Sequence, residues 1–467
     1  MDETPLDSHQ KALRINLDRA VVGTFAEIGA GQEVARWFFH VGGASGTVAK
    51  TISAYDMAVS DAVYGPTQRY VSRQRLEAML EHEYALLLDR LGPTRGDQCR
   101  FFVFADSVAT RNPARQEAGH GWLGVRFLTV PRGAPSEIII HVVTHDRECA
   151  REQAALGAVG VNLLYGAAYH SAEPATLLAS LMDNLTRDRL EIDMIKFTGP
   201  AFAGIDNRLM SLELVERGFT DATMFTAAGD VVQPAEMLYK RAILVERGRF
   251  RPVTLLTQDL LERARAQFIA EHDGRAEPPV VLMEMTLRGL GSDVGVDRRD
   301  FLARAETLRA LGQLALISNH GPYYRLVQHL SRYTQQPIGI ALGVPALMRV
   351  LDPQHYQDLP GRTLEAVGRL FAHNVRVYLY PHRDPVTGDL ITAETLRVAP
   401  PVRHLYAHLL ANCHVQPIRD YTARYLPIYT HDVLRRIQSN DPSWEGMVPA
   451  GIVEVIKSQR LFGWHGP

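Results

Sequence analysis

Residues 314–343, LALISNHGPYYRLVQHLSRYTQQPIGIALG, decide the fold of this chain. Two short runs, LALIS at 314–318 and IGIAL at 338–342, are apolar throughout and flank a segment with apolar residues at helical spacing. Strands that are apolar at every position are typical of a parallel sheet covered by helices on both faces. The stretch therefore predicts a β–α–β unit within such a sheet.

The same alternation extends to both sides of this unit. VVLMEM at 280–285 and VRVYLY at 375–380 predict further strands, with helices at 301–311 and 362–372. Nearer the N-terminus we predict strands at 101–105, 122–130 and 137–143, and the strands at 122–130 and 137–143 form a β-hairpin around PRGAP. An earlier alternating series then follows, with strands at 161–166, 192–197 and 222–225.

We therefore predict an α/β protein with two doubly wound, mostly parallel-sheet lobes, a β-hairpin insertion and a helical C-terminal part. A chain of 467 residues exceeds the size of one ordinary hydrophobic core, so more than one lobe is expected. The expected division is a glycine-rich and helical segment at 1–100, a first lobe at 101–270 and a second lobe at 271–467, with the boundary in the polar stretch near 271–277.

Charge and composition exclude several functions. The 50 basic and 52 acidic residues give a net charge of −2, so the long-range field of a nonspecific nucleic-acid binder is missing. The start, MDETPLDSHQ, is unlike a secretory signal, and no apolar run is long enough to span a membrane. Cys99, Cys149 and Cys413 form no CxxC pair. We expect a cytoplasmic protein without nucleic-acid or membrane partners, without a protein-held metal, and with homo-oligomerisation left open.

Polar residues follow several predicted strands, where open parallel sheets bind ligands. In the later series, three predicted strands are followed by such residues: Ser318, Asn319, His320 and Gly321 after the first, Gly343 after the second, and His382 with Arg383 after the third. In the earlier series, the corresponding residues are Thr198, Gly199, Asp206, Asn207 and Arg208. Histidine can exchange protons and arginine can hold a phosphate. Asn319 and Asp206 are also ordinary turn and N-cap residues, so a purely structural role stays open for them.

The stretch GTFAEIGAGQEVARWFFHVGGASGTVAKTISAYD at 23–56 is rich in glycine, which lets backbone amides approach an anion closely. We predict an anion site with Lys50 as the counter-charge and with these further ligand-binding residues: Glu27, Gly29, Gly31, Gly42, Gly43, Gly46 and Thr51. A phosphate loop at 43–51 is a weaker hypothesis, because Ala44 and Ala49 replace both motif glycines. The remaining interpretation is a tightly packed region whose polar residues satisfy each other.

Three segments carry resemblances to known families. Residues 27–31 resemble the glycine loop of Rossmann methyltransferases, which would imply S-adenosylmethionine. GRFRPVT at 248–254 resembles the GRFxPxHxGH nucleotide loop of nicotinamide-nucleotide adenylyltransferases, with Thr254 and Thr257 at the histidine positions. Over its full length the chain resembles a poorly characterised bacterial and cyanobacterial family, and the segments that carry this resemblance are GTFAEIGAGQEVARWFF, KTISAYDM and DMIKFTGPAFAGIDNRLMSLELV. Members of that family are sometimes labelled nicotinamide-nucleotide adenylyltransferases.

The leading prediction is an enzyme, with a nucleotidyltransferase-like transferase favoured, that acts on a nucleotide or another small phosphorylated ligand. Its expected catalytic residues are Lys50, Asp206, Arg208, His320 and His382, with Asn207 and Asn319 also binding ligand. No cofactor can be named, and Mg²⁺ is expected only if the substrate is a nucleotide. The alternatives are a non-catalytic metabolite sensor or homo-oligomeric assembly protein, and a methyltransferase.

Overall fold

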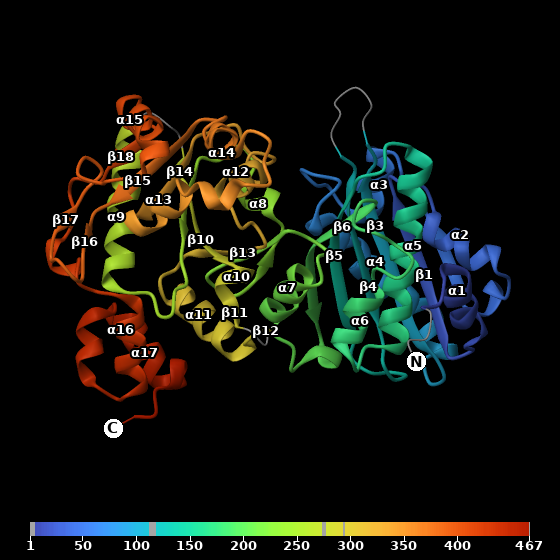
Figure 1. Cartoon of the computed structure of the whole chain (residues 1–467). Coiled ribbons are helices and arrows are strands. Elements are labelled where there is room, and N and C mark those ends of the chain that lie inside the picture. Colours follow the sequence, from blue (N-terminus) through green and yellow to red (C-terminus); the bar gives the residue numbers. More distant parts are fainter. Residues whose placement is uncertain (1–4, 112–117, 273–276, 293–294, 467) are drawn as a thin grey trace. The chain divides into compact units, whose positions relative to one another are not determined.

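Two β-sheets organise the chain, one in each of two units (Figure 1). The computed structural model describes residues 5–111, 118–272, 277–292 and 295–466. The units are Met1–Thr220 and Asp221–Pro467. The boundary expected at residue 271 lies instead inside the second unit, because the strands before and after it pair with each other in one sheet.

The first unit has a six-stranded sheet in the order β2-β1-β3-β4-β5-β6. Strands β2, β1 and β3 are parallel, whereas β3 to β6 pair antiparallel, and the predicted hairpin is present as β4 and β5. Its helices and strands are α1 (Ser8–Leu17), β1 (Val21–Ile28), α2 (Glu33–His40), β2 (Val48–Ile52), α3 (Met57–Tyr64), α4 (Arg73–Arg95), β3 (Arg100–Ala109), β4 (His120–Phe127), β5 (Ser136–Thr144), α5 (Cys149–Tyr169), α6 (Pro174–Ser180), β6 (Leu190–Thr198) and α7 (Asn207–Glu216).

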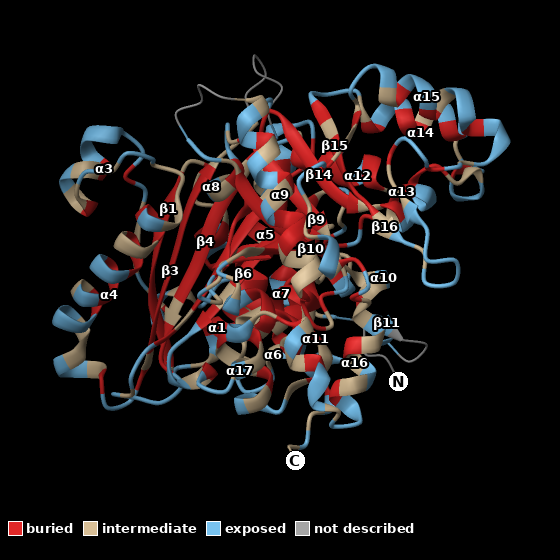
Figure 2. Ribbon diagram, turned by 90° about the vertical axis from the view of Figure 1, so that its left-hand side faces the viewer, coloured by how far each residue is buried: buried red, intermediate tan, exposed pale blue. Residues whose placement is uncertain are grey.

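Helices cover both faces of this sheet. On one face, the α5 backbone at Gly160 packs against Val34 of α2 and Phe104 of β3. Leu76 and Leu80 of α4 pack against Gly124 on the other. Figure 2 shows β3 and β4 almost entirely buried, while α3 and α4 expose one side to solvent.

The strand predicted at 161–166 is wrong, since these residues belong to α5. Val161, Leu163 and Leu164 are at most 3% exposed. A helix that is buried on all sides lacks the polar face that reveals helical periodicity, so its apolar run resembled a strand.

The second unit has an eight-stranded sheet in the order β18-β15-β14-β9-β10-β13-β7-β8. The strands from β18 to β13 are parallel to their neighbours, and β7 and β8 add an antiparallel edge. Its elements are β7 (Ala222–Phe225), β8 (Val231–Val232), α8 (Pro234–Leu238), β9 (Ile243–Arg247), α9 (Leu255–Glu271), β10 (Val280–Thr286), α10 (Leu287–Leu290), β11 (Gly291–Ser292), β12 (Gly295–Val296), α11 (Arg298–Ala310), β13 (Leu314–Ser318), α12 (Tyr323–Leu330), β14 (Ile338–Gly343), α13 (Val344–Val350), α14 (Arg362–Leu370), β15 (Val375–Tyr380), β16 (His382–Arg383), β17 (Leu390–Ile391), α15 (Arg403–Ala411), β18 (Val415–Pro417), α16 (Thr430–Gln438) and α17 (Ala450–Gln459).

This sheet is doubly wound. One face, which includes Val245 and Ile340, shares a core with α12, α13 and α14. On the other face, Phe268 of α9 packs against Gly339 and Tyr378. The α/β class, the two sheets and the predicted strands between 280 and 380 are thus confirmed. The segment at 222–225, predicted as the end of the first series, is the strand β7 of this second sheet.

Within the part of the chain that the structure describes, no helix combines the length and apolar character needed to cross a bilayer.

Candidate functional site: an arginine-lined cleft in the second unit

The strand order of the second sheet contains a switch point, which is where open α/β sheets generally bind ligands. Along the chain, the parallel strands are β9, β10, β13, β14, β15 and β18, so their spatial order from β13 is third, second, first, fourth, fifth, sixth. This is the order of the dinucleotide-binding Rossmann fold. The chain leaves β9 toward one side and β14 toward the other, which opens a crevice at the carboxyl ends of these two strands.

A cleft of about 470 Å³ lies at the carboxyl ends of these strands. Its volume is in the range of small-molecule sites, about 300–1,000 Å³. The segments that follow β9, β10, β13 and β14 all contribute to it. Its lining residues are Arg247, Gly248, Arg249, Thr286, Arg288, Gly289, Gly321, Pro322, Tyr323, Ala346, Arg349, Val350, His355 and Tyr356.

Three arginines give this cleft its charge. Arg249, Arg288 and Arg349 follow three different strands, and their side chains are exposed. In the described parts of the chain, none of the three has an ion-pair or side-chain hydrogen-bond partner. No aspartate or glutamate is among the described lining residues. The cleft therefore carries an uncompensated positive charge.

The fourth arginine, Arg247, is fully engaged at the floor of the cleft. Its Nε and Nη2 donate to the two carboxylate oxygens of Glu284 at 2.7 and 2.8 Å. Glu284 is completely buried and also accepts a hydrogen bond from the Ser318 hydroxyl. Arg247 further donates to the carbonyl oxygens of His320 and Gly321, at 2.9 and 2.6 Å. This network joins β9, β10 and β13 and fixes the loop that leads into α12.

The start of α12 also faces the cleft. Gly321, Pro322 and Tyr323 line it, and no side chain caps this helix. The N-terminal amides of a helix without a cap are available to an anion and carry the positive end of the helix dipole. The Tyr323 ring lies 4.2 Å below the Arg247 guanidinium, and burial raises the pKa of Tyr323 to about 12, so the ring stays neutral.

The GRFRPVT segment is the loop between β9 and α9. Gly248 and Arg249 line the cleft, while Phe250 is buried and anchors the loop. A Cβ at Gly248 would lie 2.5 Å from the Phe250 ring, so this position requires glycine. Thr254 is the N-cap of α9, and its hydroxyl accepts the Thr257 amide at 3.3 Å. The two threonines at the histidine positions of the adenylyltransferase pattern thus stabilise a helix, and neither lines the cleft.

Two of the predicted residues of the second unit lie next to the cleft. His320 is buried behind it, its Nε2 has no hydrogen-bond partner among the described residues, and burial lowers its pKa. Asn319 is exposed at the same turn. Gly321 lines the cleft as the junction rule predicted. His382 begins the small β16–β17 ribbon, contacts the Tyr429 ring and is not among the lining residues.

The predicted residues at the start of the first unit serve its packing. Glu27 is buried at the end of β1, and its two carboxylate oxygens accept the amides of Val34 and Ala35 at 2.8 and 2.9 Å, which caps α2. Gly29 has a φ of +104°, and a Cβ there would lie 1.8 Å from the Val108 carbonyl oxygen. Gly31, with a φ of +87°, completes the turn into α2. A strand followed by a helix fits the methyltransferase pattern, but the Glu27 carboxylate is already used by the helix.

The other glycines of this segment lie at the opposite end of α2. Gly42 and Gly43 follow the helix and Gly46 closes a short turn before β2. The helix α2 joins the carboxyl end of β1 to the start of the parallel strand β2. These glycines therefore lie at the amino ends of the strands, whereas Gly29 lies at the carboxyl end of β1. Lys50 forms an ion pair with the fully buried Glu83, and Thr51 accepts a hydrogen bond from Gln32 at 2.7 Å. The structure does not bring these residues together around one anion position.

The trio at the start of α7 has local roles. Asp206 is the N-cap, accepting the Arg208 amide at 2.9 Å, and also pairs with the Arg208 side chain at 2.7 Å. Arg208 lowers the pKa of Asp206 against the effect of burial. Asn207 accepts the amide of Phe197 at 2.8 Å and donates to its carbonyl oxygen at 3.0 Å, which ties α7 to β6.

Most residues of the cleft were not predicted from the sequence, although a signal was present. Arg288 lies in the segment after the predicted strand 280–285, where the rule for strand carboxyl ends applies. Arg249 is part of the GRFRPVT motif. Arg349 and His355 lie six or more residues beyond β14, and no sequence pattern marks them.

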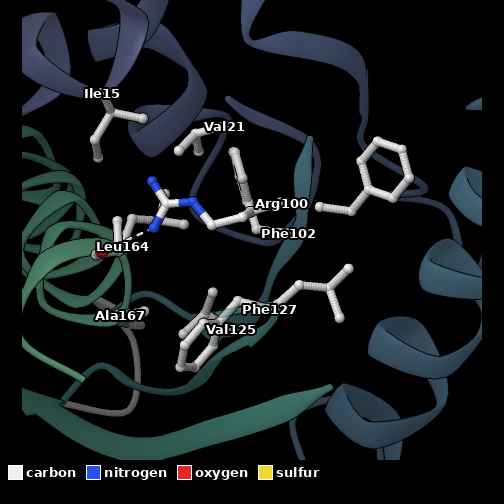
Figure 3. Close-up of a pocket in the computed structure, with 11 residues that line it drawn as sticks. Ile15, Val21, Arg100, Phe102, Val125, Phe127, Leu164 and Ala167 are labelled. Carbon is white, nitrogen blue, oxygen red and sulfur yellow. Dashed lines mark hydrogen bonds between the residues drawn. The ribbon is translucent and has the colours of Figure 1, made fainter. Parts of the chain in front are cut away.

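The first unit contains a small pocket of about 20 Å³, drawn in Figure 3. Ile15, Val125 and Leu164 are among the side chains around it, and Arg100 donates to the carbonyl oxygen of Ala168 at 3.4 Å. A space of this size holds about one water molecule at most. We interpret it as a packing defect.

The donor set of the cleft does not fit a protein-held Mg²⁺ ion. Mg²⁺ is normally bound through one or two carboxylates together with substrate phosphates. The described lining residues offer guanidinium, imidazole, hydroxyl and backbone groups. Across the described chain, no three His, Cys, Asp or Glu side chains converge as a metal site.

Comparisons with solved structures return α/β proteins at low similarity. The competence/damage-inducible protein CihA from Agrobacterium tumefaciens is 18% identical, covers 35% of this chain and 97% of its own length, and has a TM-score of 0.26. A CinA superfamily protein from Enterobacter cloacae is 12% identical, with 36% and 95% covered and a TM-score of 0.27.

The nicotinic acid mononucleotide adenylyltransferase from Plasmodium falciparum is also among these structures. It is 10% identical, covers 48% of this chain and 98% of its own length, and has a TM-score of 0.29. No protein-family model and no curated protein matches the sequence.

Proposed function

We propose that the second unit binds a nucleotide or another phosphorylated metabolite in the arginine-lined cleft, and that the chain is a transferase acting on this ligand. The observation that carries the proposal is the position of Arg249, Arg288 and Arg349, which have no partner among the described residues and line the crevice of a Rossmann-ordered sheet. Arginine presents a planar fork of donors that matches phosphate oxygens. The uncapped start of α12 adds amide donors on the same side.

The same groups can serve phosphoryl or nucleotidyl transfer. Such reactions depend mainly on positioning and on stabilising the charge that develops on phosphate oxygens. Arginines without a counter-charge are suited to this task, because they need not give up an ion pair when the ligand arrives. His355 is the lining side chain able to accept or donate a proton.

A non-catalytic sensor is the second candidate. It is favoured by the absence of a carboxylate from the described lining and by the single imidazole there. Binding would then occur without turnover. Prolonged incubation of the protein with each bound ligand and a range of acceptors, followed by mass spectrometry, distinguishes the two: a new product supports the transferase, and unchanged ligand supports the sensor.

A thermal-shift screen tests ligand binding. The purified full chain is heated with nucleotides, dinucleotides, S-adenosylmethionine or sugar phosphates, with and without Mg²⁺. A ligand at a hundredfold excess over its Kd stabilises the folded state by about 2.7 kcal/mol. We expect a shift with a phosphorylated compound, loss of most of that shift in the double variant Arg288→Ala/Arg349→Ala, and no change in Arg265→Ala.

Arg265 is a matched control, since it is an exposed helical arginine of the same unit and does not line the cleft. An equal shift in the wild type and in the double variant would contradict the cleft as the binding site.

A further inference from the structure

The cleft holds more positive charge than one phosphate group needs. Within the described parts of the chain, Arg249, Arg288 and Arg349 have no counter-charge, and Arg247 is neutralised by Glu284. The other carboxyl group on β9, Glu246, points to the opposite face of the sheet because side chains alternate along a strand. It is buried, which raises its pKa well above the ordinary value, and it is not among the described residues that line the cleft.

Charge matching then defines the ligand. A terminal phosphoryl group carries about −1.5 to −2 at pH 7, so a single group would leave at least one of three guanidinium ions uncompensated. Two linked phosphoryl groups match the three arginines. The arginines are on segments that follow β9, β10 and β14, so they can contact such a ligand from separate sides.

The lining also explains how such a ligand could bind without a metal. Polyphosphates usually enter protein sites with Mg²⁺, which needs carboxylate, carbonyl or water oxygens. The described lining offers no carboxylate, and its guanidinium groups would compete with a divalent cation for the same phosphate oxygens. The arginines thus stand where a bound cation would otherwise neutralise the phosphates.

We infer that the cleft recognises a diphosphate group in its metal-free form, a conclusion that rests on the proposed function and specifies its ligand class. The cleft is much larger than a diphosphate, and the side chains of Tyr323, Ala346, Val350 and Tyr356 leave an apolar wall for the organic part of the ligand. The two phosphoryl groups would lie between Arg249, Arg288, Arg349 and the first amides of α12.

Isothermal titration of the full chain with inorganic pyrophosphate and with orthophosphate, at matched ionic strength, tests the inference. We expect pyrophosphate to bind at least about tenfold more tightly than orthophosphate, because it gains further charge-assisted hydrogen bonds. EDTA should leave this affinity unchanged, and an excess of MgCl₂ should weaken it several-fold by taking up the probe. Arg288→Ala should lose about tenfold in pyrophosphate affinity, and Arg265→Ala none.

Equal affinities for the two anions, or pyrophosphate binding that appears only with Mg²⁺, would overturn the inference. The result also separates this inference from the proposed function. If a nucleotide binds only as its Mg²⁺ complex and metal-free pyrophosphate does not bind, the inference fails and the proposed function stands. If no phosphorylated compound binds under any of these conditions, both fail.

Discussion

Arg247 and Glu284 form an ion pair inside the second unit that holds the floor of the cleft. Glu284 is fully buried and the Arg247 side chain is only 14% exposed, so loss of either partner leaves the other charge poorly hydrated. A buried pair of this kind adds little net stability, but removal of one partner leaves an uncompensated charge. The pair therefore fixes the geometry of the cleft more than it stabilises the fold.

We expect Glu284→Gln to lower the free energy of unfolding of the second unit by about 3–5 kcal/mol. Urea denaturation measures this change. Glu445→Gln is the control, because its pair with Lys457 is 40% and 37% exposed and should contribute at most about 1 kcal/mol. A loss in Glu284→Gln no larger than in the control would show that Arg247 keeps its place without the carboxylate.

At this scale the sequence reveals the chemistry of single residues but not their partners. Lys50 looked like a free counter-charge for an anion, and it is paired with Glu83 from α4. Asp206 looked like a catalytic acid and is a helix cap, the structural role that its sequence position also allowed. Partners that come from distant segments, such as Glu284 for Arg247, cannot be inferred from one sequence without the fold.

At the scale of elements, α2 depends on a cap from outside the helix. The side chain of Gln32, at the N-cap position, does not cap the helix, and the Glu27 carboxylate of β1 takes over this role. Glu27 is the register partner of Asp106 on β3, and both side chains are buried. Burial raises the pKa of Glu27 from 4.5 to about 7, and burial together with Glu27 raises the pKa of Asp106.

These raised pKa values make the stability of the first unit depend on pH. The folded state keeps protons that the unfolded chain releases, so the contribution of these two groups to stability is fully present below the unfolded pKa of 4.5 and is lost as the pH rises through about 7. We expect Asp106→Asn to weaken this dependence. Between about pH 5 and about pH 8, the variant should lose less unfolding free energy than the wild type, by on the order of 1–3 kcal/mol.

Urea denaturation at both pH values, with hydrogen exchange at the Val34 and Ala35 amides, tests this expectation. Asp89→Asn is the control, because Asp89 is exposed in the same unit. Parallel pH profiles for the wild type and Asp106→Asn would contradict a protonated carboxyl pair at the end of β1 and β3.

Elements were predictable where their pattern was regular. The strands at 280–285, 314–318, 338–342 and 375–380 alternate with helices, and all four are present. β9 was missed because its five residues end in Glu246 and Arg247, whose charges interrupt the apolar run. These two side chains are largely buried only because of the neighbouring strands and helices, which the sequence alone does not show. The strand β9 is the first of the Rossmann-ordered set. The switch point therefore could not be located from the sequence.

At the scale of the whole molecule, the class and the two sheets were predictable and the division of the chain was not. The polar stretch near 271–277 looked like a boundary, but β9 and β10 on its two sides are neighbours in one sheet. The sequence also pointed to a phosphorylated ligand, but it placed the anion site in the first unit. The glycines there form turns around α2, whereas the arginines without a partner among the described residues are in the second unit.

The central claim is that phosphorylated ligands bind the arginine-lined cleft of the second unit. A crystal structure of the full chain with bound adenosine diphosphate tests it most directly. We predict phosphoryl oxygens within hydrogen-bond distance of the Arg249, Arg288 and Arg349 guanidinium groups, beside the first amides of α12. Phosphoryl groups held by Gly29, Gly43 or Lys50 in the first unit, or away from all three arginines, would contradict the account.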